Sequence, residues 1–356
     1  MTIITGFSIE RYRRSTRAYR WRSGLAGGGG GPGVAGLLRV HTDSGHEGLC
    51  WIDKERISTA IIEDVLAPAF VGADVWMRET HWYRMWDTDR IEMLPLYALN
   101  YIDVALWDIQ SKLAGVPTWK LLGGHKAAAK AYASTVTLGS TDEYLRLIDG
   151  CLERGYQAIK LHVWGDARAD AQLAQADRRH VGPNVELMLD GSGGYTLDEA
   201  LRLGRVLEEA GYLWFEEPLR EYNLFVYERL CNSLDIPILG AETPAGCHFN
   251  ASEWMIRGAC DRIRTAWCEK GGFTGALKVA HLAESFQLQA DVHGDDLGAL
   301  QLVCALPNST WLEVLDPEDT FGNATLRGPL FPDSKGMVYA PETPGIGWEP
   351  DPSLRI

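Results

Sequence analysis

The chain after residue 125 repeats one pattern, in which short apolar runs alternate with longer amphipathic stretches. Each run has the length of a buried strand, and each stretch has the periodicity of a helix that covers a sheet. Eight runs in this order predict an α/β fold, a (β/α)8 barrel of parallel strands inside a ring of helices. The expected strands are 131–136, 157–163, 185–190, 213–216, 237–242, 262–267, 288–293 and 310–314.

The N-terminal part of the chain has a different pattern. Strand-like runs at 3–12, 37–42 and 48–51, the last two around a short turn, predict a small antiparallel sheet. Residues 27–33 are glycine apart from one proline and are expected to form a mobile loop. The pattern leaves open whether this loop is a lid over the barrel mouth or a surface loop.

A helix is predicted over residues 94–114, where apolar residues recur at spacings of three and four. Gly115 and then Pro117 supply its end. Asp108 and Lys112 stand four residues apart on this helix, a spacing that predicts a weak surface ion pair.

Three consecutive barrel strands end in an acid. Glu216 ends the fourth strand, Asp190 lies 26 residues before it and Glu242 lies 26 residues after it. Because parallel strands of a barrel place their carboxyl ends together, the three carboxylates are expected to converge. Their mutual repulsion in a partly buried site is relieved by a hard divalent cation, and oxygen ligands favour Mg²⁺.

Composition narrows the possible partners and location. The net charge of −14 argues against nucleic acid and against an anionic membrane as partners. No apolar run has the length of a membrane span. Seven cysteines without a paired spacing indicate reduced thiols in a cytoplasmic protein, and Cys268 and His281 are interpreted as structural because neither belongs to a recognisable metal motif.

The motifs taken together resemble the enolase superfamily, and within it the mandelate racemase/muconate lactonizing enzyme group. The residues that carry the resemblance are Ala105-Leu106-Trp107-Asp108, Lys160-Leu161-His162, Asp190, Phe215-Glu216-Glu217-Pro218, Ala241-Glu242, Gly271-Gly272-Phe273-Thr274, His293 and Trp311-Leu312-Glu313. The resemblance implies an α+β capping domain at 1–125, the barrel at 126–317, and a C-terminal segment at 318–356 that returns to the capping domain.

The resemblance also implies a chemistry. Asp190, Glu216 and Glu242 would hold Mg²⁺, which binds the carboxylate of a small-molecule substrate while a base removes the α-proton. Removing that proton places a second negative charge on the carboxylate, and a fixed dication stabilises the resulting enediolate. Glu313 occupies the position of a protonated hydrogen-bond donor in this pattern, although it could also be a plain acid at a strand end.

The expected base differs from the group's pattern. The resemblance places Lys-x-Lys at the end of the second strand, whereas this chain has Lys160-Leu161-His162. Alternation along a strand points Lys160 and His162 to the same side, towards the lumen. Lys160 is then expected to position the substrate carboxylate. His162 is the candidate base, the alternative being a hydrogen-bonded histidine that only fills the barrel.

The other face of the substrate is expected to meet His293. The resemblance pairs this histidine with an aspartate on the sixth strand, but Ala266 stands at that position. Asp291, two residues before His293 on the same strand face, is a possible substitute for the missing aspartate, but its side chain is expected to point poorly towards His293. His293 could therefore serve as an acid that assists a leaving group, or only as a donor that binds ligand.

One base and one acid favour dehydration of a sugar acid to a 2-keto-3-deoxy acid, because a racemase needs a competent base on each face. Two alternatives stay open at this point: a racemase or epimerase of an α-substituted carboxylic acid, and a metal-binding barrel that has lost catalysis. The resemblance also makes a symmetric homo-oligomer the expected assembly.

Overall fold

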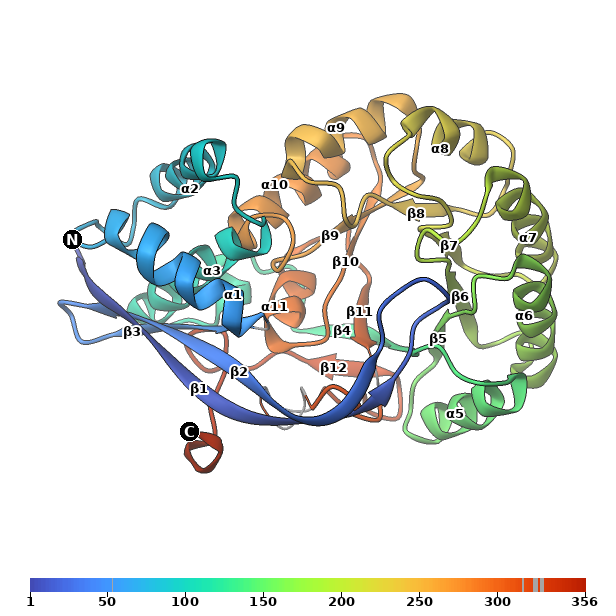
Figure 1. The fold of residues 1–356 in the computed structure, drawn as a ribbon, viewed down its shortest axis with the longest axis horizontal. Coiled ribbons are helices and arrows are strands. Elements are labelled where there is room, and N and C mark those ends of the chain that lie inside the picture. Colours follow the sequence, from blue (N-terminus) through green and yellow to red (C-terminus); the bar gives the residue numbers. More distant parts are fainter. Residues whose placement is uncertain (53, 316, 323–325, 327–329) are drawn as a thin grey trace.

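The computed structural model describes residues 1–52, 54–315, 317–322, 326 and 330–356, which form a closed barrel with a smaller sheet beside it (Figure 1). Pairing of β11 with β4 closes the barrel, so the predicted (β/α)8 fold is confirmed. The parallel strands are β4 (Ala128–Ser134), β5 (Ala158–His162), β6 (Glu186–Asp190), β7 (Trp214–Glu216), β8 (Ile238–Gly240), β9 (Arg262–Thr265), β10 (Gln289–Val292) and β11 (Trp311–Leu315).

Helices cover the outside of the barrel (Figure 1). They are α5 (Thr141–Glu153), α6 (Ala167–Val181), α7 (Leu197–Glu209), α8 (Leu224–Cys231), α9 (Cys247–Arg257), α10 (Gly272–Ser285) and α11 (Leu297–Ala305). Several of these helices begin next to a side chain that caps the first turn. At α7 the Thr196 side chain and the Glu199 side chain form a reciprocal capping box that satisfies two backbone donors.

An aromatic layer fills the barrel interior below its carboxyl end. The layer consists of Tyr132, Ala158, Met188, Trp214, Leu239 and Trp311, which form a cluster separate from the main core. Trp214 Nε1 donates a 3.1 Å hydrogen bond to Glu216 Oε2, so the acids at the strand ends rest on this layer. The barrel interior is therefore filled by side chains up to the level of these acids.

The N-terminal sheet consists of β1 (Ile4–Tyr19), β2 (Gly28–Thr42) and β3 (Glu47–Ile52) in antiparallel order. The expectation of a mobile loop at 27–33 is wrong, because all but the first of these residues belong to β2, a strand that pairs with β1. A Cβ on Gly28 would lie 2.4 Å from the Tyr19 ring, so a larger residue there would displace that ring. The long partner strand, which the sequence pattern shows only in part, orders the glycines.

The end of the β1–β2 hairpin lies against the mouth of the barrel (Figure 1). Arg22 Nε donates a 2.8 Å hydrogen bond to the Ser192 carbonyl, and Ser23 N donates to the Trp164 carbonyl at 3.3 Å. Thr137 N in turn donates to the Arg20 carbonyl at 3.1 Å. These contacts with loops after β4, β5 and β6 make the hairpin end a cover of the barrel mouth.

The remaining helices connect the sheet to the barrel. They are α1 (Glu55–Ala60), which continues as a π-helical segment (Ile61–Leu66) and a 3-10 turn (Ala67–Ala69), α2 (Arg78–Glu92), α3 (Tyr97–Ala114) and α4 (Thr118–Leu121). The predicted helix is α3, which ends at Gly115 in the left-handed conformation. Among the described residues, helices lack the combination of length and apolar sequence needed to cross a membrane.

Asp108 on α3 is a structural acid and not the surface ion-pair partner that its spacing predicts. It is 2% exposed, and its carboxylate accepts backbone hydrogen bonds from Leu49 at 2.9 Å and from Ile346 at 2.8 Å. The Lys112 ammonium completes this site at 2.6 Å. Asp108 thus fastens the N-terminal sheet and the C-terminal segment to one helix.

The C-terminal segment contacts both parts of the molecule. β12 (Met337–Tyr339) pairs antiparallel with β4, a 3-10 turn follows at Pro352–Leu354, and Ile356 N donates to the Arg11 carbonyl at 2.9 Å. Residues 323–325 and 327–329 of this segment lie outside the described residues. The domain boundaries at 125 and 317 stay a prediction.

Candidate active site

The side chains expected to carry chemistry come together at the carboxyl end of the barrel. Lys160 and His162 end β5, Asp190 ends β6 and Glu216 ends β7. The others are Glu242, which follows β8, His293, which follows β10, and Glu313 on β11. Parallel pairing brings these distant segments to one edge, as the spacing of the acids predicts.

The three acids at consecutive strand ends are linked by two buried cations. Lys160 Nζ lies 3.5 Å from Asp190 Oδ2 and 3.0 Å from Glu216 Oε2. Arg264 Nε lies 2.7 Å from Glu216 Oε1 and 3.5 Å from Glu242 Oε2. The carboxylates therefore form one continuous charged cluster, and Glu216, fully buried, is at its centre.

Arg264 is a site residue that the sequence analysis missed. Besides Glu216 it contacts Glu313 Oε2 at 3.1 Å and the Tyr132 hydroxyl at 3.0 Å, and it is 1% exposed. The available signal was an arginine inside a run otherwise typical of a buried strand, where a charge is costly unless it is paired. Its partners come from β7 and β11, which sequence patterns do not place beside β9.

The surroundings of Glu313 favour its ionised form, whereas the resemblance implies a protonated donor at this position. Its Oε1 lies 2.7 Å from Lys160 Nζ. Burial raises the pKa of Glu313, but the charges of Lys160 and Arg264 outweigh this effect and hold it well below the usual range. Burial likewise lowers the pKa of Lys160, whereas Glu216 and Glu313 raise it well above the usual range, so Lys160 stays a cation.

His162 is held by two contacts at its two ring nitrogens. Nδ1 lies 2.6 Å from the Thr135 carbonyl oxygen, and Nε2 lies 3.1 Å from Asp190 Oδ2. Burial raises the pKa of Asp190, but the charges of His162 and Lys160 outweigh it and hold the pKa well below the usual range. Because a carbonyl only accepts, Nδ1 carries a hydrogen, and Nε2 is the atom that faces the site, where it donates to Asp190 when the ring is protonated.

His293 stands among acids on another side of the mouth. Its Nδ1 lies 3.3 Å from Glu313 Oε2 and 3.4 Å from Glu242 Oε2. Burial lowers the pKa of His293, but the charges of Glu242 and Glu269, with Glu313, raise it to about 10. His293 is therefore an imidazolium at neutral pH, a form suited to giving a proton.

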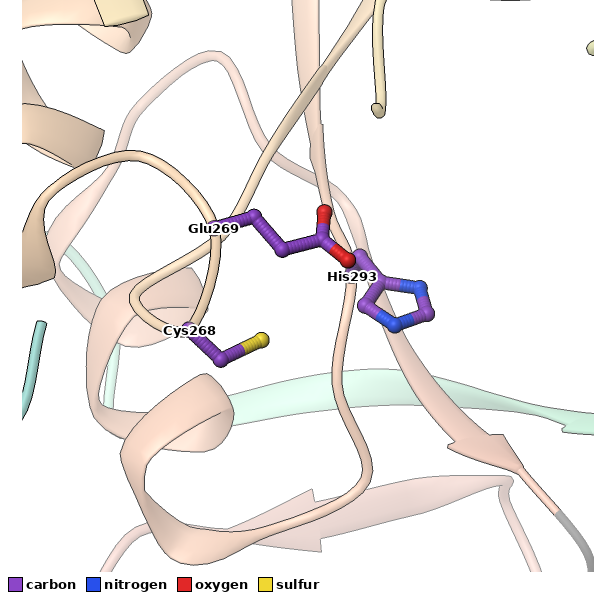
Figure 2. Close-up of side chains that lie close together, drawn as sticks. All are labelled: Cys268, Glu269 and His293. Carbon is purple, nitrogen blue, oxygen red and sulfur yellow. The ribbon is translucent and has the colours of Figure 1, made fainter. Parts of the chain in front are cut away.

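Glu269 supplies a carboxylate near His293 that the sequence analysis did not identify. Ala266 lacks a carboxylate at the position where the resemblance expects one. Glu269, three residues further on, directs its carboxylate towards His293 (Figure 2). The suggested substitute, Asp291, is committed elsewhere, because both its oxygens pair with Arg262 at 2.8 Å.

Glu217, next to Glu216 in sequence, is buried close to other acids. Its Oε1 accepts a 3.0 Å hydrogen bond from the Glu242 backbone N, and the side chain is 5% exposed. Burial, followed by the charges of Glu242 and Glu221, raises the pKa of Glu217 well above the usual range. Its surroundings therefore favour the protonated form of Glu217.

A cavity of about 370 Å³ opens above this cluster, within the range typical of small-molecule sites. Most of its lining is polar or charged, and the hairpin end adds two apolar side chains. The lining residues are Trp21, Leu25, His162, Asp190, Ser192, Glu217, Arg220, Glu221, Glu242, Thr243, His293 and Leu315. The Trp21 ring lies 4.9 Å from the His162 ring, so the hairpin covers the candidate base.

The donor set of Asp190, Glu216 and Glu242 fits a hard divalent cation. All donors are carboxylate oxygens, and such ligands suit Mg²⁺. Asp190 and Glu242 reach the cavity, whereas Glu216 lies beneath it between Lys160 and Arg264. The surplus of negative charge at the mouth is the feature that a dication would balance.

A closed (β/α)8 barrel with acids at three consecutive strand ends and a covering N-terminal sheet has the architecture of the enolase-type barrels. Residues 24–123 match the family described as mandelate racemase / muconate lactonizing enzyme, N-terminal domain. Residues 143–354 match the family described as enolase C-terminal domain-like. The chain therefore belongs to the mandelate racemase/muconate lactonizing enzyme group of the enolase superfamily.

Proteins with known names show similarity along most of the chain. Arabinonate dehydratase of Saccharolobus solfataricus is 30% identical over 304 residues, 81% of this chain and 79% of the relative. D-galactarolactone cycloisomerase of Agrobacterium fabrum is 30% identical over 341 residues, 88% of each chain. The crystal structure of D-glucarate dehydratase from Agrobacterium tumefaciens complexed with magnesium has a TM-score of 0.88 and 32% identity over 99% of both chains.

Proposed function

We propose that this protein dehydrates a sugar acid to a 2-keto-3-deoxy acid, with His162 as base and His293 as acid. The observation that carries the proposal is the unequal setting of the two histidines. His162 has its Nδ1 hydrogen held by the Thr135 carbonyl, so Nε2, beside Asp190, is the atom that takes the proton once it carries no hydrogen of its own. His293 lies among carboxylates that favour its protonated form.

The proposed reaction balances with these two groups. His162 Nε2 takes the proton from the α-carbon of the substrate, and the electron pair of the broken C–H bond forms a carbon–carbon double bond. The β-carbon loses its hydroxyl, to which His293 gives a proton, so that water leaves. The enol product then tautomerises, taking up a proton at the β-carbon and releasing one from its oxygen, to give the 2-keto-3-deoxy acid. Lys160, a buried cation beneath the site, stabilises the negative charge that develops above it.

Asp190, Glu216 and Glu242 would hold Mg²⁺ in this proposal. Bound there, the ion would supply positive charge against the second negative charge that the substrate carboxylate acquires on proton loss. Support comes from the oxygen-only donor set and from the magnesium in the similar crystal structure. Ionised Glu313 keeps Lys160 and His293 charged, which is a supporting role different from the one expected from sequence.

The substrate class is supported by the relatives and by the cavity. Two of the similar proteins are named as dehydratases of sugar acids, arabinonate and D-glucarate. The cavity wall offers charged and hydroxyl groups, among them Ser192, Thr243 and Arg220, to a polyhydroxylated chain. A racemase would need His293 to act as a base, and its carboxylate neighbours oppose the loss of its proton.

The test is a screen of the Mg²⁺-loaded protein against a library of aldonic and aldaric acids, scored for 2-keto-3-deoxy product. Each substrate is also incubated in deuterated water and analysed for α-deuterium. Product formation supports the proposal. Deuterium exchange or epimerisation without product would replace it with the racemase or epimerase alternative. Absence of both across the library, with Mg²⁺ bound, would favour a barrel that has lost catalysis.

A further inference from the structure

Three different metal-binding side chains meet at one edge of the active site. Cys268 and Glu269 lie in the loop between β9 and α10, and His293 follows β10. Each offers a donor atom, and the three atoms lie within 4.8 Å of one another (Figure 2). All three side chains are half-buried. Sequence spacing could not show this cluster, because 23 residues, including a helix, lie between Glu269 and His293.

The loop that carries Cys268 and Glu269 is firmly held. Asn100 on α3 accepts hydrogen bonds from the backbone N of Gly271 at 2.8 Å and of Gly272 at 3.0 Å, and its amide donates to the Cys268 carbonyl. Such contacts to the backbone keep donor atoms in place before a ligand arrives.

The adjacent Lys270 is turned away from the cluster. Its Nζ donates to the carbonyl oxygens of Ala241 at 2.8 Å and Glu242 at 2.6 Å. Glu269 Oε2 is buried and has no hydrogen-bond partner among the residues that the structure describes. A buried carboxylate oxygen without a donor is costly, and a cation would remove that cost.

A separate cavity of about 310 Å³ gives access to the cluster. Cys268 and His293 both line it, together with Trp267, Asp296 and Phe321 among others. His293 therefore borders this cavity and the substrate cavity at once. A cation can enter from this side without passing the three-carboxylate site, and an entry path is one requirement of a real metal site.

The donor types decide which cation fits. Thiolate, imidazole and carboxylate together suit Zn²⁺, whereas Mg²⁺ prefers oxygen alone. We propose that Cys268, Glu269 and His293 form a zinc site separate from the magnesium site, with water as the fourth ligand. A bound Zn²⁺ displaces the proton from one ring nitrogen of His293 and the proton from the thiol of Cys268, and both protons go to solvent.

Zinc at this place is an inhibitor of the reaction proposed above. The function of His293 is to give a proton to the leaving hydroxyl, and a nitrogen that ligates a metal has no proton to give. This consequence rests on the proposed function, whereas the metal site itself does not. The two are therefore tested by separate measurements.

Binding is measured by titrating the full-length protein with Zn²⁺ in excess Mg²⁺, by calorimetry and without substrate. The wild type is expected to bind one equivalent, and Cys268→Ser to weaken binding by more than about tenfold. Cys231→Ser, which alters another half-buried thiol on α8, is the matched control and is expected to bind as the wild type does. Zinc affinity unchanged in Cys268→Ser would overturn the site.

Spectroscopy gives an independent reading of the ligands. Co²⁺ substituted for Zn²⁺ is expected to show a thiolate charge-transfer band in the wild type and in Cys231→Ser, and none in Cys268→Ser. Glu269→Gln retains the thiolate and is expected to keep the band while binding more weakly. A band that persists in Cys268→Ser would assign the cation to a different thiol and refute the proposal.

Inhibition is then measured on whichever substrate the screen yields. Zinc at the concentration that fills the site is expected to suppress dehydration by the wild type and to leave Cys268→Ser active. Equal inhibition of both proteins, with the binding results as expected, would reject the inhibitory role while the metal site stands. If no substrate is found, the binding and cobalt experiments still decide whether the site exists.

Discussion

The Nδ1 atom of His162 lies 2.6 Å from the carbonyl oxygen of Thr135. A backbone carbonyl accepts and cannot donate, so this contact fixes the hydrogen on Nδ1 and turns Nε2 towards the substrate cavity. The orientation of the candidate base is thus set by the strand next to it, because Thr135 directly follows β4, which pairs with β5.

Replacing His162 by alanine is expected to abolish solvent exchange at the α-carbon of the substrate. General base catalysis contributes about 10²- to 10⁴-fold, so the exchange rate measured by mass spectrometry in deuterated water should fall by at least the lower figure. His281→Ala, on the exposed face of α10, is the control. A mutant that exchanges as fast as the wild type would refute the assignment of His162 as base.

His293→Asn is expected to separate the two halves of the reaction. The variant keeps His162, so α-proton exchange continues, but no acid is left to protonate the departing hydroxyl, and product formation should fall by about 10²-fold or more. Parallel assays of deuterium uptake and of 2-keto acid measure both steps. Loss of exchange together with product would show that His293 acts before or during proton removal.

Glu216→Gln is expected to remove Mg²⁺ binding, because an amide is a weaker ligand than the central carboxylate. Calorimetric titration with Mg²⁺ measures the effect, and circular dichroism verifies the fold. Glu217→Gln is a matched control next in sequence: Glu217 has a raised pKa and is already neutral, so its amide should leave the affinity nearly unchanged. Retained Mg²⁺ affinity in Glu216→Gln would contradict the ligand set.

Arg264→Met is expected to destabilise the fold by about 3–5 kcal/mol, because it leaves Glu216 and Glu313 without one of their cations. Urea unfolding of the apoprotein measures this free energy. Arg202→Met, which removes an exposed pair with Asp198 on α7, should change it by less than about 1 kcal/mol. Similar effects of the two substitutions would mean that the buried cluster is not held by Arg264.

Asp177→Asn is expected to stabilise the protein more at pH 8 than at pH 5. Both carboxylate oxygens of Asp177 are buried without a partner in the described structure, and burial raises its pKa to about 8. Between the unfolded pKa of about 4 and this value, folding requires uptake of a proton, so wild-type stability falls as pH rises.

Asparagine cannot ionise, so the stability of the variant does not fall with pH in this way. The difference in free energy of unfolding between the variant and the wild type therefore grows across the same pH range to about 1–3 kcal/mol. Thermal unfolding at several pH values measures the difference. A gain that does not depend on pH would show that Asp177 carries no ionisation cost in the folded state.

Those features that depend on short-range pattern could be predicted from the sequence. The eight strands follow from apolar runs, and the convergence of Asp190, Glu216 and Glu242 follows from equal spacing, because one βα unit has a nearly constant length. The helix over α3 and its end at Gly115 follow from periodicity and from the conformational freedom of glycine. Each of these signals lies within a few residues or repeats at a fixed interval.

The features that were missed depend on contacts between distant segments. The glycines of β2 are ordered because β1 continues beside them to Tyr19, and Asp108 is buried because β3 and the C-terminal segment both close over it. No local pattern contains either partner.

The charge states of the site residues were the features least predictable from the sequence. The charge state of a group depends on the sum of the charges that surround it in the folded protein. Glu313 is ionised because Lys160 and Arg264 reach it from β5 and β9, and Cys268 gains metal-binding neighbours only where β10 passes its loop. A residue's type and spacing indicate which chemistry it can perform. Its protonation and its partners arise from packing in three dimensions, because electrostatic interactions act through space and not along the chain.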